Sequence, residues 1–238
     1  MGDAGAGGGA GAEGDGGDGA AMTSHRPWRP HRYLKYFFLD DLDTVRHIPA
    51  GRLWGVPISV TPTVWLQGPF FYAIGVVLTW LPGRMPPGAA AADRALDALV
   101  FMVAGLAANG LHAVGHIVSG RLAGSAMDEL LLTATRDANI YRGDQRGIAG
   151  RTHIARAVGG PLANLAAAAA AFALLAAIGA GGGAGRAVLA RLASVNLGFG
   201  LGSFLPVPSV DGEVIWREVG RAWRRRGGHG ATGPNEGS

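Results

Sequence analysis

The distribution of hydrophobic residues along the chain is the strongest structural signal in the sequence. Four runs contain no Asp, Glu, Lys or Arg: Leu53–Gly83, Ala98–Gly120, Ala157–Gly185 and Leu192–Val210. A helix that crosses the hydrocarbon core of a bilayer needs about 20 mostly apolar residues, and each run is near or above that length. The polar remainder of a 238-residue chain is too small to cover four such runs in water. We therefore predict an all-α integral membrane protein with about four transmembrane helices.

The connections between the runs add detail to this prediction. Three prolines near the start of the first run predict an extended beginning and a kinked first turn. The one sizeable polar connection, Ser125–Arg156, contains the strand-like stretches MDELLLTATR and ANIYRG, which predict a short β-hairpin between spans two and three. In the last run, Pro206 and Pro208 interrupt the helix and leave Asp211 at the membrane boundary.

Charge is sparse and unevenly placed. Charged residues make up 16% of the chain, against roughly 25% in an average soluble protein. All but four of the 21 Lys and Arg residues lie before the first span, between spans two and three, or after span four. With four spans these segments share one side, which the positive-inside rule makes cytoplasmic, together with both termini. The placement of the basic residues therefore accounts for the net charge of +4 and indicates a multi-pass protein of the cell membrane. We expect the lipid bilayer as its partner and no binding of nucleic acid.

Shifts in composition divide the chain into four parts. Residues 1–22 form a Gly/Ala/Asp-rich tail that we predict to be disordered, and either Met1 or Met22 could be the true start. Residues 23–52 form a basic, aromatic segment that lies either in the membrane interface or in solvent. Residues 53–216 form the membrane domain. Residues 217–238 form a basic, Gly-rich tail, whose arginines either contact anionic lipid headgroups or only set the orientation.

Candidate chemistry lies in the second run, in the sequence LHAVGH. His112 and His116 stand four residues apart and share one face of a helix, so both imidazoles can bind one metal ion. The chain has no cysteine, so a third ligand must be His, Asp or Glu. Asp211 is the strongest candidate, because the prolines before it and Gly212 after it let the chain turn its carboxylate inward. Alternatively, the histidines are hydrogen-bonded core residues and Asp211 is an interfacial aspartate.

Four motifs occur in the order and spacing of the site-2 protease family: GRLWGVPISV, HAVGH, GGPLANL and FLPVPSVDG. The chain resembles this family over roughly Gly51–Trp216. The resemblance implies a membrane-embedded centre that binds zinc through His112, His116 and Asp211 and cleaves transmembrane helices of other membrane proteins. It also implies a substrate or active-site region that contains Gly160, Pro161 and Asn164.

One residue departs from the family pattern. Ala113 occupies the position of the HExxH glutamate, which takes a proton from water and delivers it to the leaving amine. Alanine cannot carry a proton, so we predict a zinc-binding pseudoprotease that holds or regulates transmembrane partners. A working metalloprotease would need a base from another segment, either Glu129 or Glu213, each of which is alternatively a solvated charge. A third interpretation is a metal-free membrane scaffold or transporter.

Overall fold

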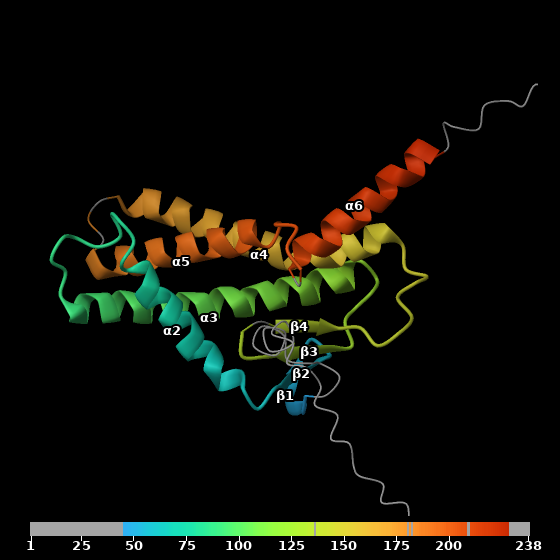
Figure 1. Cartoon of the computed structure of the whole chain (residues 1–238), viewed down its shortest axis with the longest axis horizontal. Coiled ribbons are helices and arrows are strands. Elements are labelled where there is room, and N and C mark those ends of the chain that lie inside the picture. The colour runs from blue at the N-terminus through green and yellow to red at the C-terminus, as the bar shows by residue number, and fades with distance from the viewer. Residues whose placement is uncertain (1–44, 136, 180, 182, 209, 229–238) are drawn as a thin grey trace, which may run out of the picture.

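The computed structural model describes residues 45–135, 137–179, 181, 183–208 and 210–228 (Figure 1). The predicted tail at residues 1–22 and most of the predicted interfacial segment at 23–52 lie outside the described residues. Within the described ranges the elements follow the order β1 (Ile48–Leu53), β2 (Val56–Val60), η1 (Val64–Leu66), α2 (Gln67–Leu78), α3 (Ala91–Leu122), β3 (Glu129–Leu132), β4 (Asp137–Ile140), α4 (Gly150–Ile178), α5 (Gly183–Gly202) and α6 (Asp211–Gly228).

The first apolar run begins in extended backbone, as predicted, but this part belongs to a β-hairpin, and the helix within residues 53–83 is shorter than the predicted span. β1 and β2 form an antiparallel hairpin that turns at Trp54 and Gly55, where φ is 46° and 83°. Pro57 within β2 and Pro62 two residues after it disfavour a helix there. The α-helical part, α2, has 12 residues, or about 18 Å, too short for a hydrocarbon core of about 30 Å. The all-α fold class is thus corrected to a mostly helical fold with a four-stranded sheet.

The predicted hairpin between the second and third apolar runs is confirmed as β3 and β4. The two strands are antiparallel, with Glu129 opposite Ile140 and Leu132 opposite Asp137. β2 pairs with β3 in parallel, so the strand order is β1-β2-β3-β4 and β4 is an outer strand. One face of the sheet packs on α3, where a buried apolar cluster joins the two layers: Val56, Ala113, Ile117, Met127 and Leu130.

Two of the described helices, α3 and α4, are long and apolar enough to cross a membrane. α5 has 20 residues but carries Arg186 and Arg191 in its first half. Large apolar side chains of α3 and α4 remain exposed, among them Leu96, Val103, Leu162 and Phe172, and such side chains suit contact with lipid. These features support a membrane protein. The number of spans and the orientation of the termini remain predictions.

The helices α3, α4 and α5 lie against one another and form the body of the molecule (Figure 1). α3 and α4 cross at Gly115 and Gly159, where a Cβ on either residue would collide with the backbone of the other. Small residues at a crossing allow two helices in a membrane to approach closely. This close approach brings the face of α3 that carries the two histidines directly against α4.

The chain makes a turn between α5 and α6. α5 ends at Gly202, before Pro206 and Pro208, and α6 begins at Asp211 and projects away from the body (Figure 1). The expected break after span four is therefore present, although a helix follows it. α6 also runs across position 216, where the sequence places the end of the membrane domain. The division into domains remains a prediction.

Candidate metal centre

The two histidines of α3 point toward one location. His112 and His116 lie one helical turn apart, and their Nε2 atoms are 3.0 Å from each other. The rings stand edge to face at 76°, with centroids 4.7 Å apart. His116 is buried and His112 is half-buried. Two ring nitrogens that face each other at this distance need either a shared proton or a shared cation between them.

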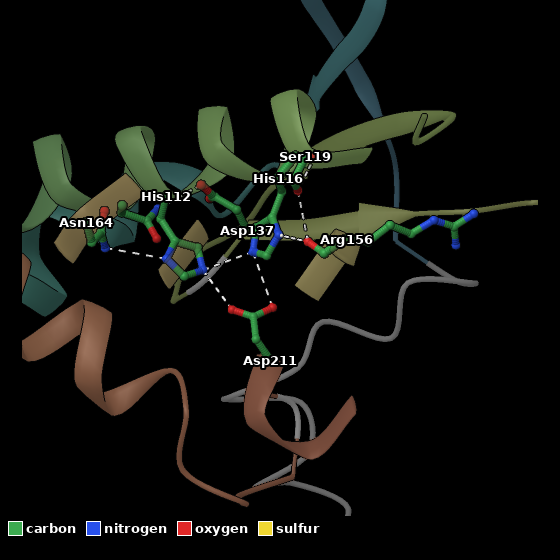
Figure 2. Close-up of polar contacts among 8 residues, drawn as sticks. His112, His116, Ser119, Asp137, Arg156, Asn164 and Asp211 are labelled. Carbon is green, nitrogen blue, oxygen red and sulfur yellow. Dashed lines mark hydrogen bonds and ion pairs between the residues drawn. The ribbon is translucent and has the colours of Figure 1, made fainter. Parts of the chain in front are cut away.

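Asp211 reaches the same location from the first residue of α6 (Figure 2). Its Oδ2 lies 2.9 Å from His112 Nε2, and its Oδ1 lies 3.2 Å from His116 Nε2. The turn before α6 holds the carboxylate there, because Gly212 N–H donates to the Ser203 carbonyl at 2.7 Å. A Cβ at Gly212 would lie 2.6 Å from the carbonyl carbon and oxygen of Phe204. Only glycine fits this turn without a shift of the chain.

α4 supplies the space around the two histidines. A Cβ on Gly160 would stand 2.5 Å from Nε2 of both His112 and His116. Any side chain at this position would therefore enter the space that the two nitrogens face. Pro161 is fully buried beside it within α4. The GGP segment singled out in the sequence thus lies against the histidine pair.

The outer nitrogens of the histidines also have partners. His116 Nδ1 donates to the Arg156 carbonyl at 2.8 Å, which leaves Nε2 with its lone pair free to bind a cation. Asn164 is fully buried, and its Nδ2 lies 3.4 Å from His112 Nδ1. The Asn164 Oδ1 is buried without a hydrogen-bond partner among the described residues. A half-turn of the amide would bring Oδ1 to Nδ1–H of His112 and give both atoms a partner.

This arrangement fits zinc. Among the described residues His112, His116 and Asp211 form a group whose ligand atoms all lie within 4.8 Å of one another. In tetrahedral zinc sites with bonds of about 2.0–2.2 Å, neighbouring ligand atoms are about 3.3 Å apart, close to the 2.9–3.2 Å found here. Two imidazoles and a carboxylate are also a common donor set of catalytic zinc. Gly160 keeps the space between them open.

The charge on Asp211 suits a ligand. Burial by itself raises the pKa of this carboxyl group, but the hydrogen bonds with His112 and His116 outweigh burial and lower its pKa to about 2. The side chain is therefore ionised at neutral pH. An ionised carboxylate beside two imidazoles balances part of the charge of a divalent cation.

Ala113 lies on the sheet side of α3. Its side chain is buried in the apolar cluster with Val56, Met127 and Leu130, and it also lines a cavity beside the histidines. Its methyl group has no proton to give or take. At the position where the family has a glutamate, this chain therefore has a small apolar side chain that packs against the sheet.

The two carboxylates proposed from the sequence as replacement bases have other surroundings. Glu129 is buried at the start of β3, where His47 Nδ1 lies 3.0 Å from its Oε1 and Arg142 forms an ion pair with its Oε2. It lines neither cavity beside the histidines. Glu213 lies two residues after Asp211 and lines one of those cavities, but its side chain is 46% exposed and an Arg217 nitrogen is 3.5 Å away.

Two cavities of about 420 and 350 Å³ flank the histidine pair, and both are lined by His116, Asp137 and Asp211. Asp137 begins β4 and is drawn with the cluster in Figure 2. Burial raises its pKa to about 6, although hydrogen bonds from Asn109 and Gln67 act to lower it. Asp137 is not among the site residues predicted from the sequence. The one feature of the sequence that points to Asp137 is its acidic side chain within the predicted hairpin, which follows the histidine helix.

The architecture is a helical body with a small four-stranded sheet, and two apolar helices support a membrane protein. No family model matches the chain, and no curated protein matches it. Among solved structures, the fold is similar to the site-2 protease from Methanocaldococcus jannaschii, with a TM-score of 0.50 and 16% sequence identity over 73% of this chain and 71% of that one. At this identity the similarity concerns the fold alone.

Proposed function

We propose that this protein binds zinc through His112, His116 and Asp211 and uses the centre to hold a segment of a transmembrane helix from another membrane protein. The observation that carries the proposal is the convergence of two Nε2 atoms and one carboxylate on the space that Gly160 keeps open. The fold similarity to a site-2 protease adds independent support.

The chain's own residues account for how the centre would be built. His116 is oriented by the Arg156 carbonyl, His112 by Asn164, and Asp211 by the turn before α6. When bound, zinc supplies a Lewis acid that polarises a carbonyl group and makes nearby water more acidic.

The cavities suggest how a peptide would lie beside the ligands. The smaller one is lined by Phe70 and Phe71 of α2 and by Phe199 of α5, which suit apolar side chains. Asn139 of the outer strand β4 lines both cavities. An outer strand can pair with an extended peptide, and a scissile amide is accessible only where its helix has unwound. We infer that the segment held is the unwound part of a transmembrane helix.

Two forms of this function differ in whether the held segment is cut. The pseudoprotease form follows from Ala113, because the family's proton carrier is absent from the histidine helix. A peptidase form requires a carboxylate from elsewhere, and the position of Asp137 in both cavities favours it. The two forms share the same zinc ligands, so the metal is tested first.

Metal analysis of the full chain purified in detergent tests the shared proposal. We expect stoichiometric zinc in the unaltered protein and its loss in His112→Ala, His116→Ala and Asp211→Asn. His153→Ala and Asp144→Asn are matched controls, because these residues are outside the cluster, and they should keep the metal. An unaltered protein without zinc, or zinc that persists in the three ligand variants, would contradict the proposal and favour a metal-free scaffold or transporter.

A further inference from the structure

Asp137 occupies a position that combines exposure to the cavities with firm attachment to two helices. It is the first residue of β4 and lies opposite Leu132 of β3. Asn109 of α3 donates a hydrogen bond from Nδ2 to Asp137 Oδ2 at 2.8 Å, and Gln67 of α2 donates from Nε2 to Oδ1 at 3.5 Å. The carboxylate is thus held in place by amide groups that neither add nor remove a proton.

The side chain shares both cavities with two of the proposed zinc ligands. His116 and Asp211 line each cavity together with Asp137, and His112 lines the smaller one as well. A carboxylate offers about four lone-pair sites, and the two amides use two of them. Lone pairs therefore remain to accept a proton from water in the cavity. The burial that raises the pKa of Asp137 to about 6 gives it a stronger affinity for that proton than an ordinary aspartate has.

The position of Asp137 also explains how the chain can have alanine at position 113, where the family has glutamate. The sheet packs on α3 through Ala113, and the outer strand of the same sheet carries Asp137 to the cavity that Ala113 lines. Asn109, which holds Asp137, stands one turn before Ala113 on α3. The carboxylate thus reaches the histidine pair from the strand instead of from the helix.

We propose that Asp137 is the general base of an intramembrane peptidase, in the role that the missing glutamate of the histidine helix would have had. This inference rests on the zinc site proposed above. Asp137 takes one proton from a water molecule while the water oxygen bonds to the scissile carbonyl carbon. When the C–N bond breaks, the same proton passes to the nitrogen, which leaves as an amine. The other product is a carboxylic acid, and Asp137 returns to its carboxylate form.

The first test measures cleavage with purified full-length protein in liposomes and a library of single-span helices, with products identified by mass spectrometry. We expect cleavage by the unaltered protein that zinc chelation abolishes. Asp137→Asn keeps the size of the side chain and one acceptor oxygen for the amide contacts but cannot take up a proton, and it should lower cleavage by about 10²–10⁴-fold. Asp137→Glu, which keeps a carboxylate, should retain part of the activity, and Asp144→Asn in the exposed loop should retain all of it.

A second readout does not depend on turnover. Acetohydroxamic acid binds zinc as its anion, so a neighbouring base that accepts its proton strengthens binding. We expect Asp137→Asn to keep its full zinc content while its affinity for acetohydroxamic acid falls about tenfold or more. A residue that only anchored the hairpin to α3 would leave that affinity unchanged as long as the zinc and the fold persist.

The outcomes separate this inference from the proposed function. If the unaltered protein holds zinc but cleaves none of the helices, or if Asp137→Asn cleaves and binds hydroxamate as the unaltered protein does, the role of Asp137 is overturned and the zinc site stands. If the unaltered protein holds no zinc, the proposed function itself fails, and the inference fails with it. Cleavage that resists chelation overturns both.

Discussion

Gly160 of α4 lies so close to His112 of α3 that a methyl group in its place would stand 2.5 Å from the imidazole Nε2. The same methyl group would be equally close to Nε2 of His116. Because Gly160 of α4 has no side chain, the imidazoles of both histidines on α3 have the space that they occupy.

Gly160→Ala should weaken zinc binding while the helices remain folded. The added methyl group must push the imidazoles apart, and overpacking of this kind costs about 1–3 kcal/mol, or roughly tenfold to a hundredfold in affinity. Competition with a chromophoric chelator measures the change. Gly198→Ala in α5 is the matched control, because its Cβ would meet nothing within 4 Å; an equal loss of zinc in both variants would refute the steric explanation.

Asn164→Ala should also weaken zinc binding, by about 10–100-fold, as removal of a partner of a metal-bound histidine usually does. The variant leaves His112 Nδ1 without its neighbour and lets the ring rotate. Zinc affinity and thermal stability should be measured together. Asn196→Ala removes another buried asparagine, which donates to the Leu192 carbonyl at 2.8 Å within α5, and it should alter stability without altering zinc affinity.

Gly115→Ala should destabilise the fold. Its Cβ would lie 2.8 Å from the Ala163 Cβ and would collide with the carbonyl oxygen of Gly159, so α3 and α4 would have to separate, at a cost of about 1–3 kcal/mol. Thermal unfolding in detergent, followed by circular dichroism, measures this. Gly110→Ala lies on the same helix with nothing within 4 Å of its Cβ and should leave the unfolding temperature unchanged or higher.

Glu129→Gln should destabilise the protein at neutral pH and much less in acid. Burial tends to raise the pKa of Glu129, but hydrogen bonds from Ser59, His47 and Arg142 outweigh it and lower the pKa below its ordinary value of 4.5. The stabilisation is therefore complete above about pH 4.5 and is lost as the pH falls through the lowered value. Replacement of the charged acceptor should cost about 1–3 kcal/mol at pH 7. Denaturant unfolding at pH 7 and at a series of decreasing pH values below 4.5 tests the expected convergence, and Glu213→Gln, at an exposed position, should show little effect throughout.

The parts of the site that follow from local geometry were predictable. The helical repeat puts His112 and His116 on one face, and the proline break with Gly212 turns Asp211 inward, as the structure has it. The strand at 56–60 was not predictable in the same way, because a short apolar run satisfies both a buried strand and a membrane helix by hydropathy. The location of Asp137 beside the histidines was not predictable from the sequence, since it depends on the register of β4 against β3 and on the packing of that hairpin on α3.

The distance along the chain between the ligands has a consequence for biosynthesis. Ninety-nine positions separate His112 from Asp211, and α4 and α5 lie between them. During synthesis both histidines leave the ribosome long before the carboxylate does, so the nascent chain has only two of the three ligands while its apolar helices meet the membrane. The three side chains can come together only after α5 has been made and Asp211 has followed it from the ribosome.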